Sequence, residues 1–385
     1  MKEGWEYKKI KDIGSVIGGT TPNTNIAEYW DGNFCWISPA ELDGSHYLYD
    51  SRKKITEAAV KAKSLKLLPA GTVILSSRAP IGKVVINKVP TYCNQGFKCV
   101  ICGKEIYNEF LYWWLWGKTE YLNSLGTGAT FKEISKKVVE DITIPVPPLS
   151  EQQHIVDYLD SAFAKIDAMK ANAEKALNEA KALFQASLKE MLEPKEGWEK
   201  KTLGDVCAIT SLLVNPVEEQ YKNLLHVGGA NIISESGEFS DLKTAEEENL
   251  ISGKFLFDTE DVLYNKIRPY LKKVARPDFS GLCSADMYPL KHKDCITRDF
   301  LYYVLITKDF TDYAILNSGR AGMPKVNRQA LFAYSFSLPS LSEQQSIVEN
   351  LDSLKSKVDR LQENFDKISQ ECDALKQAML RQVFE

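Results

Sequence analysis

Apolar residues recur at helical spacing in two long stretches of the chain. After Ser342 they follow one another in alternating steps of three and four residues over four heptads, a pattern typical of a helix packed along one seam. The first half keeps this register, with smaller side chains, as far as Pro194, which ends a helix. The predicted seam positions are Leu351, Leu354, Val358, Leu361, Phe365, Ile368, Cys372, Leu375 and Met379, and earlier Leu159, Ala162, Ile166, Met169, Ala173, Ala176, Ala180, Leu183 and Ser187.

Polar residues predict where these two helices begin. Ser150 and Gln153 have the spacing of a capping box, as do Ser342 and Gln345. Prolines just upstream keep the preceding chain extended. The sequence therefore predicts two helices of about 40 residues, or roughly 60 Å, each.

Small residues in one seam and large ones in the other favour packing of the two helices on each other. An antiparallel arrangement places small residues of the first helix opposite large residues of the second, which fills a core without voids. It would also relate the two halves by a pseudo-twofold axis. The alternative is that each helix pairs with another chain. The expected pairs are Ala162 with Leu375, Ala173 with Phe365, Ala176 with Leu361, and Ala180 with Val358.

The chain is an internal duplication. LSEQQHIVDYLD at 149–160 returns as LSEQQSIVENLD at 341–352 with nine of twelve residues identical, and KEGWE at 2–6 returns at 195–199. A period of about 193 residues is too long for a solenoid, so each copy should be a complete domain plus an appendage. The sequence therefore predicts a first domain at 1–149, a long helix at 150–194, a second domain at 195–341 and a second long helix at 342–385.

Each globular copy mixes strands with helices. In the first copy, 71–77 and 92–102 are β-rich, whereas 56–67 and 108–125 have helical patterns. The second copy repeats this order. The predicted fold class is therefore α/β (α+β), with two similar globular domains joined by two long antiparallel coiled-coil helices.

Composition supports an ordinary folded protein. With 385 residues, 44% apolar and 26% charged, the chain can bury two domain cores. Its eight cysteines form no dense framework, and no basic-then-apolar leader precedes Trp5, so we expect a cytoplasmic protein. The apolar run at 110–116 is too short to span a bilayer, and the helix that contains it is expected to be core.

Charge argues for binding only locally. The net charge of −4 does not indicate a polyanion binder, although residues 1–149 carry +4 and 197–340 carry −2. Basic residues lie among glycines in 126–132 (GTGATFK) and 319–328 (GRAGMPKVNR), at matched places in the two copies. One such cluster is more often a solvated face, but two in matched loops favour phosphate binding.

Catalytic motifs do not emerge. There is no GxxxxGK[ST] phosphate loop, HExxH or GxSxG, and Cys99 with Cys102 is a lone pair that lacks the second pair of a zinc site. The four histidines fall at unmatched places in the two copies, whereas a catalytic group of a duplicated enzyme should recur. The chain is predicted to bind and not to catalyse.

The junction IPVPPLSEQQHIVDYLD at 144–160 and its echo SLPSLSEQQSIVENLD at 337–352 resemble those of type I restriction-modification specificity subunits. The likeness covers the whole chain and includes GGTTPNTNIAEYW at 18–30 and YNKIRPYLKKV at 264–274. It implies that each domain recognises half of a split double-stranded DNA target. The coil would dock two methyltransferase subunits that modify adenine, and restriction/translocase subunits would join them. S-adenosylmethionine, ATP and Mg would then be bound by partners, and this chain would hold no cofactor.

Residue roles follow more loosely from side-chain chemistry and from this resemblance. Arg and Lys suit guanine edges or phosphates, and Asn or Gln suits adenine. The DNA-binding candidates are Arg78, Lys83, Gln95, Lys98, Lys132, Arg268, Lys272, Lys273, Arg320, Lys325, Asn327 and Arg328. The partner-binding candidates are Ser150, Glu151, Gln152, Gln153, Glu174, Glu179, Ser342, Glu343, Gln344 and Gln345.

Two other functions stay open on sequence alone. A coiled-coil scaffold would bind protein and retain no DNA, and a duplicated metal-dependent nuclease would act without partners. The LSEQQ stretch has its own alternative, which is that it only caps a helix.

Overall fold

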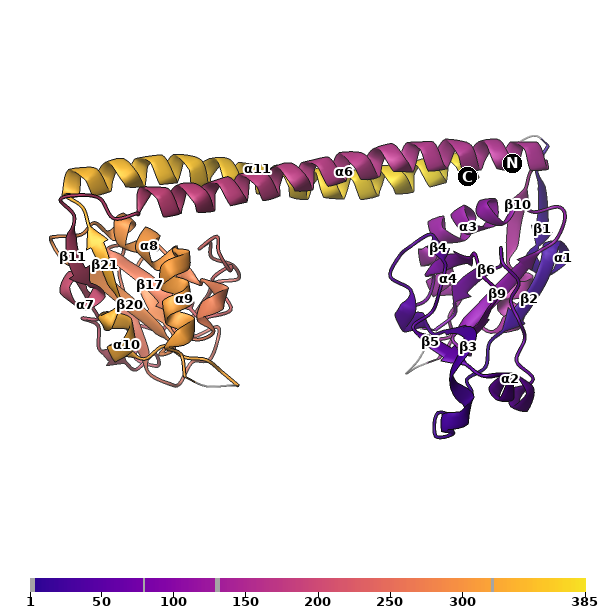
Figure 1. The fold of residues 1–385 in the computed structure, drawn as a ribbon, viewed down its shortest axis with the longest axis horizontal. Coiled ribbons are helices and arrows are strands. Elements are labelled where there is room, and N and C mark those ends of the chain that lie inside the picture. The colour runs from indigo at the N-terminus through magenta and orange to yellow at the C-terminus, as the bar shows by residue number, and fades with distance from the viewer. Residues whose placement is uncertain (1–3, 79, 129–131, 320–321) are drawn as a thin grey trace. The chain divides into compact units, whose positions relative to one another are not determined.

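The computed structural model describes residues 4–78, 80–128, 132–319 and 322–385. The chain forms two compact units. The first unit comprises Met1–Ala171 and Ile368–Glu385, and the second comprises Asn172–Lys367. Two long helices, α6 and α11, each contribute to both units (Figure 1). The prediction of two mixed α/β units with long helices is confirmed.

In the described part of the first unit, the main sheet has the strand order β2-β9-β6-β7-β4. Its central strands are buried, and α3 covers one face, so the aromatic run at 110–116 lies in the core as predicted. A smaller sheet, β5-β3-β8, pairs β3 with β8 in parallel. The bounds are β2 Gly14–Gly18, β3 Trp30–Ile37, β4 Tyr47–Leu48, β5 Lys53–Ile55, β6 Val73–Ser76, β7 Val84–Asn87, β8 Thr91–Cys93, β9 Phe97–Cys102, α1 Ile10–Ile13, α2 Glu57–Lys63, α3 Asn108–Gly117, α4 Thr119–Ser124 and α5 Lys136–Asp141.

The second unit repeats this plan within its described residues. One sheet has the order β12-β20-β17-β18, and the other, β13-β16-β19-β14-β15, again contains a parallel pair, β14 with β19. Helix α8 packs on β17 as α3 packs on β6 and β7. The bounds are β12 Cys207–Ala208, β13 Leu213–Val214, β14 Leu225–Val227, β15 Lys243–Thr244, β16 Lys254–Phe257, β17 Asp261–Asn265, β18 Val274–Ala275, β19 Gly281–Cys283, β20 Met287–His292, α7 Leu203–Val206, α8 Arg298–Ile306, α9 Lys308–Leu316 and α10 Arg328–Ala333.

A two-stranded antiparallel ribbon leads into each long helix. In the first unit β1 (Glu6–Lys9) pairs with β10 (Thr143–Val146), and in the second β11 (Glu199–Thr202) pairs with β21 (Ser335–Leu338). Each ribbon brings a tryptophan of one repeated motif close to the other motif, because Trp5 and Trp198 directly precede the first strand and LSEQQ follows the second.

The long helices are α6 (Leu149–Met191) and α11 (Leu341–Phe384). Both predicted helices are confirmed, but the predicted capping boxes are wrong. The first turn of α6 bonds back to the Pro148 carbonyl, and Gln153 donates to Asp157 one turn ahead. The helices begin earlier than the capping serines because the proline-restricted segments already supply the first acceptors.

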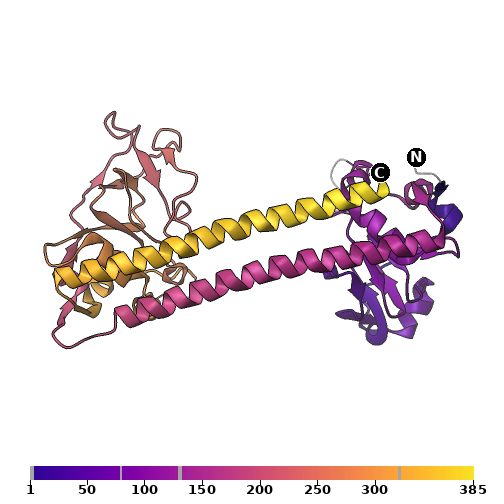
Figure 2. The same ribbon diagram turned by 90° about the horizontal axis from the view of Figure 1, so that it is seen from above.

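The two helices run antiparallel where they meet inside each unit. In the first unit Lys376 pairs with Asp167 and Lys170 pairs with Asp373. Figure 2 shows the C-terminal part of α11, in yellow, alongside the N-terminal part of α6. In the second unit, Lys181 donates to Gln362 at 2.8 Å.

Four large apolar residues of the predicted seam, Met169, Leu183, Leu361 and Leu375, are exposed. Leu375 and Leu361, expected opposite Ala162 and Ala176, have 50% and 37% of their surface exposed. The pairing of large with small residues is therefore wrong at these two layers. Phe163 and Leu177, one position after the predicted alanines, are buried instead, because their larger side chains have more apolar area to remove from water.

Each unit builds its core partly from both long helices. Val156, Leu159 and Phe163 of α6 join the core of the first unit, together with Leu380 and Phe384 of α11. The second core correspondingly takes side chains from the end of α6 and the start of α11. Among the described residues, no helix has the length and apolarity needed to cross a membrane.

Candidate nucleic-acid interface

In the first unit, the loop before α5 folds back against the chain that leaves β6. Ile134 N donates to Ser77 O at 2.9 Å, while the backbones of Thr127 and Glu133 exchange hydrogen bonds of 2.9 and 3.1 Å. The loop that the sequence singled out is thus held at its base beside Arg78. Its tip, 129–131, lies outside the described residues.

Glu133 is shared by two cations at this place. Its carboxylate accepts from Arg78 Nε at 2.9 Å and from Lys98 Nζ at 3.2 Å, and Lys98 also donates to Ser77 Oγ at 3.0 Å. Partial burial would raise the pKa of Glu133, but the hydrogen bonds from Lys98 and Arg78 outweigh burial and lower that pKa. The three side chains therefore carry a net charge of +1. We call Arg78, Lys98 and Glu133 the first cation cluster.

The second unit builds the same feature from other residues. Val326 N donates to Lys266 O at 3.0 Å, and Lys325 N donates to Ser318 O at 3.0 Å, which repeats the loop base of the first unit. Here the carboxylate is Asp286, which lies 3.2 Å from Lys325 Nζ and 3.6 Å from Lys266 Nζ. Burial is the largest influence on Lys266 and lowers its pKa. We call Lys266, Asp286 and Lys325 the second cation cluster.

Arg268 lies next to the second cluster on a constrained backbone. Its φ is 52° and that of Lys272 is 47°, values that residues with long side chains rarely adopt. Arg268 N donates to Pro324 O at 2.9 Å, so the strand-end turn and the basic loop hold each other, while the Arg268 side chain stays exposed. Backbone strain of this kind accumulates at functional loops.

The remaining candidates are not all gathered at these clusters. Lys132 is exposed beside the first cluster, and Gln95 accepts from Thr21. In the second unit, Lys273 donates to Gly229 O and Asn327 caps α10. The Lys272 ammonium lies 3.9 Å from the Glu235 carboxylate. The Arg328 guanidinium lies over the Tyr288 and Phe255 rings. Arg320 lies outside the described residues.

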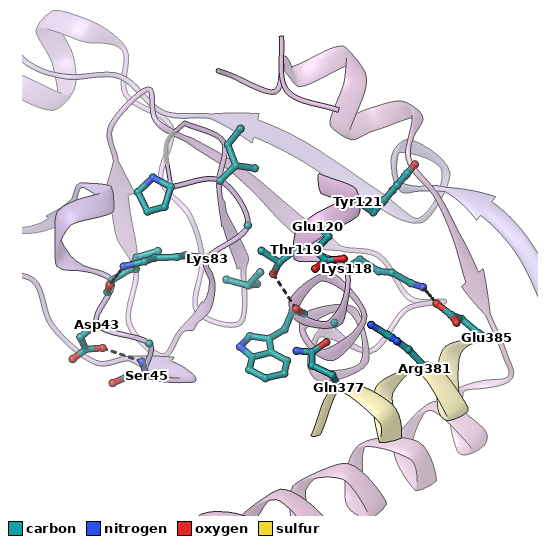
Figure 3. A pocket seen from close by; sticks show the side chains of 18 residues that line it. Asp43, Ser45, Lys83, Lys118, Thr119, Glu120, Tyr121, Gln377, Arg381 and Glu385 are labelled. Atoms are coloured by element: carbon teal, nitrogen blue, oxygen red, sulfur yellow. Dashed lines mark hydrogen bonds and ion pairs between the residues drawn. The ribbon is translucent and has the colours of Figure 1, made fainter. Parts of the chain in front are cut away.

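Lys83 lies away from the first cluster, on the wall of a cavity of about 940 Å³ (Figure 3). Its Nζ donates to Leu42 O at 2.7 Å. In Figure 3, Arg381 and Glu385 of the α11 end lie on the opposite side, and Lys118 pairs with Glu385. The mixed charges of this lining do not favour an anion.

The first glutamine of each LSEQQ motif is fully buried within its own unit. Gln152 Oε1 accepts from Tyr107 N at 2.7 Å, and its Nε2 donates to Glu105 O and Pro147 O at 2.9 and 2.8 Å. Gln344 makes the same three bonds in the second unit. These two side chains offer no surface to a partner. Their position has a structural role that spacing could not reveal.

The glutamate that precedes this glutamine and the aspartate that ends the motif also bond to the domain of their own unit. Glu151 accepts from Trp5 Nε1 at 2.9 Å, and Asp160 accepts from Trp113 Nε1 at 2.8 Å. In the second unit, Glu343 accepts from Trp198 Nε1 at 3.1 Å and Asp352 accepts from the Tyr303 hydroxyl at 2.6 Å. The repeat therefore joins helix to domain in both units. The partner-binding candidates that remain on the surface are Ser150, Gln153, Glu174, Glu179, Ser342 and Gln345.

The profile of the type I restriction modification DNA specificity domain matches residues 2–179 and again 195–370. The chain belongs to the family of type I restriction-modification specificity subunits. Two copies of the family domain cover nearly all of this specificity subunit, in agreement with the resemblance of its junctions.

Known specificity subunits resemble this one in sequence and in fold. The MjaIX specificity subunit of Methanocaldococcus jannaschii is 39% identical over 240 residues, which span 57% of this chain and 56% of that protein. The EcoDI specificity subunit of Escherichia coli is 31% identical over 313 residues, spanning 72% and 70%. The HsdS subunit of Thermoanaerobacter tengcongensis aligns with a TM-score of 0.57 at 19% identity, covering 100% of this chain and 97% of that one. A chain solved for work on complex assembly and conformational transition of the type I R-M system aligns at a TM-score of 0.78, also at 19% identity, over 100% and 98%.

Sequence reasoning about this specificity subunit missed one cation and both carboxylates of the two clusters. Nothing in the sequence marks Glu133, Asp286 or Lys266 as a neighbour of the other cluster residues, because the cluster geometry depends on strand ends meeting a distant loop. It also missed Trp5 and Trp198, although their recurrence in the KEGWE repeat was a usable signal. Among the described residues, no three His, Cys, Asp or Glu side chains are grouped to hold a metal ion.

Proposed function

We propose that each unit recognises one half of a split double-stranded DNA target through its cation cluster and the adjoining basic loop. The observation that carries this is the recurrence of two cations around one carboxylate at the same loop base in both units. Loops that approach DNA supply phosphate contacts, which position a protein, and base contacts, which specify the sequence. Family membership supports the same reading.

The two clusters favour an asymmetric target. In the first unit Arg78 offers a guanidinium, which suits the O6 and N7 edge of guanine, whereas both cations of the second cluster are lysine ammonium groups. The exposed Arg268 extends the second surface from a different chain position. Different donors at equivalent places should read different bases, so the two half-sites should not be copies of each other.

A domain exchange tests this proposal. Residues 1–149 are replaced by the first domain of another specificity subunit, and the methylated motif is read after co-expression with the methyltransferase. We expect one half-site to change and the other to stay. The chain with its own domain is the control. If both half-sites change, or neither does, the units do not read the target independently. A protein-only scaffold would give no methylation motif in either case.

We further propose that α6 and α11 carry the docking surface for two methyltransferase subunits, which restriction/translocase subunits then join. Each unit leaves apolar side chains exposed on the coil: Met169 and Leu375 in the first, Leu183 and Leu361 in the second. The antiparallel register places each pair at one level of the coil, so the same surface occurs twice. The fully buried centre of a protein interface is more apolar than the rest of the surface.

The acidic candidates on α6 border this surface. Glu174 and Glu179 are exposed, and Glu179 has a weak pair with Lys175 at 3.8 Å. Replacing Met169 and Leu375 by serine should reduce recovery of methyltransferase in pull-down, and Glu174→Lys with Glu179→Lys should slow association. His154→Ala, at an exposed position of the same helix, is the matched control. Unchanged recovery with all of these variants would make the coil a spacer only.

In this scheme the chain performs no chemistry of its own. S-adenosylmethionine, ATP and Mg belong to the partner subunits, and the complex works in the cytoplasm. The eight cysteines are all free thiols in the structure, as a reducing compartment would keep them.

A further inference from the structure

We infer that three repeated motif positions form a clasp that fixes the direction of each long helix on its unit, and that this clasp sets the spacer accepted between the half-sites. The inference deepens the proposed function and rests on it. We call the following residues the helix clasp: Glu151, Gln152 and Asp160 in the first unit, Glu343, Gln344 and Asp352 in the second.

The buried glutamine is the centre of the first clasp. Gln152 bonds Glu105 and Tyr107 in the segment before α3, and Pro147 at the end of β10, so one side chain ties two separate parts of the domain to the first turn of α6. Every polar atom of its amide is satisfied, and the side chain has no exposed surface. Its removal would leave buried backbone groups without partners, which costs more than the lost bonds themselves.

The second clasp has the same geometry at the same offset. Gln344 accepts from Thr297 N at 2.8 Å and donates to Cys295 O and Pro339 O at 3.0 Å each. Thr297 stands directly before α8, as Tyr107 stands directly before α3. The amide therefore couples the start of the long helix to the start of the main domain helix in both units.

Two attachment points separated along an axis fix its direction as well as its position. Asp160 lies nine residues after Glu151, which is about 13 Å along the helix. Between them Ile155, Val156 and Leu159 face the core of the first unit. Helix α6 therefore cannot tilt on its domain without breaking either the Gln152 bonds or the Asp160 bond.

The donors to the two aspartates differ, although the aspartate recurs. Asp160 accepts from Trp113, whereas Asp352 accepts from Tyr303 and from Arg276 at 2.8 Å. The attachment is thus retained while its chemistry changes.

The consequence for DNA follows from duplex geometry. One added base pair moves a distant half-site by about 3.4 Å and turns it by about 35°. A domain held rigidly on its helix cannot follow this movement, so the spacer length is restricted. A domain that rocks on its helix can follow it, and neighbouring spacers become acceptable.

The test uses the full chain assembled with its methyltransferase subunits. A DNA library carries the two half-sites at randomised spacings, and methylation is counted by sequencing. The clasp variant is Gln152→Ala with Gln344→Ala, and the matched control is His154→Ala with Ser346→Ala, two exposed residues at equivalent positions of the repeat. We expect the preference for the best spacer over one base pair more to fall from about tenfold to below about threefold in the clasp variant alone, with unchanged half-site bases.

Hydrogen exchange at the Tyr107 and Thr297 amides reports whether the clasp has opened. An unchanged spacer preference with faster exchange at these amides would overturn the inference. If the alanine variant does not fold, Trp5→Phe with Trp198→Phe removes one bond per unit, and its spacer preference is judged in the same way. A wild-type complex that selects no half-site bases refutes the proposed function, whereas one that selects bases but tolerates every spacer refutes the clasp alone.

Discussion

The two units hold the aspartate of the helix clasp in different surroundings. In the first unit His46 stacks on Tyr112 with ring centroids 3.8 Å apart and bonds Glu109 at 2.8 Å, close to the Trp113 that donates to Asp160. The second unit has no histidine at the corresponding place among its described residues; it has an arginine.

Arg276 occupies that place in the second unit. Its guanidinium lies 4.4 Å from the Tyr302 ring, 3.2 Å from Asp299 and 2.8 Å from Asp352. Burial opposes its charge, but Asp352 and the neighbouring acidic groups outweigh burial and raise the pKa of Arg276. Asp299 corresponds to Glu109 by position, so the carboxylate is retained and the group facing it has changed.

This difference teaches that the duplicated frame fixes where a polar bond is needed and leaves its donor free to vary. An arginine can bridge two carboxylates with its planar fork, whereas a histidine offers one bond to one of them. In the first unit Asp160 accepts from the Trp113 indole, and burial raises the pKa of Asp160. The first junction should therefore lose less than the second when its central side chain is removed.

The largest effect is expected from Arg276→Ala. Asp299 and Asp352 would lose their shared cation while keeping their charges. Because both carboxylates are more than a third exposed, water offsets part of the loss, and we expect a decrease of about 2 kcal/mol in the free energy of unfolding of the second unit. Urea unfolding followed by tyrosine fluorescence measures it. Arg360→Ala, an exposed arginine of the same unit, should change it little. Equal losses in the two variants would refute the bridging role.

A smaller effect is expected from His46→Phe. The aromatic ring can still stack on Tyr112, but Glu109 would lose its 2.8 Å bond to His46 and keep its contacts with Lys88, at 3.5 Å, and with Tyr47. We expect the first unit to lose about 1 kcal/mol, the usual contribution of one hydrogen bond. Tryptophan fluorescence during unfolding reports this unit through Trp113. His154→Phe, on the exposed surface of α6, is the control. A loss as large as that of Arg276→Ala would erase the contrast between the two junctions.

The smallest effect on stability, below about 0.5 kcal/mol, is expected from Glu133→Gln and from Asp286→Asn, because both carboxylates lie at the surface. Each change removes the carboxylate that pairs with an exposed cation, Arg78 in the first unit and Lys325 in the second, and leaves that cation free for DNA. The slope of log K against log salt, measured by fluorescence anisotropy with the assembled complex, should steepen by about 0.9 per added phosphate contact. Glu120→Gln and Asp294→Asn are exposed controls. A change in one unit alone would show that the clusters are not equivalent.

Much of the fold could be predicted from the sequence, because it depends on the local pattern of apolar and polar residues. The heptads, the prolines and the repeat place both long helices within a few residues of their ends, and alternating apolar runs indicate the buried strands. The antiparallel direction followed from residue size in the two seams. The deeper burial of Phe163 than of Ala162 did not, because both side chains are apolar, and the rest of the unit determines which of them turns inward.

The candidate sites were predicted less completely. Matched basic loops pointed to both clusters, since glycines and cations are visible in sequence. A cation and its carboxylate can be far apart in the sequence, as Lys98 and Glu133 are. The sequence does not show which of the 52 acidic residues will lie beside a given cation. Spacing also could not tell an outward glutamine from an inward one, and so Gln152 was expected at the surface.

By itself the sequence determined the duplication, the two helices and the family, because each depends only on the order and spacing of residues along the chain. The tertiary structure alone decided that Glu151, Gln152 and Asp160 face the domain. Their partners, Trp5, the segment before α3, and Trp113, reach them through sheet pairing over long stretches of chain. A hydrogen bond depends on a few tenths of an ångström and on angle, and only the packed core fixes those quantities.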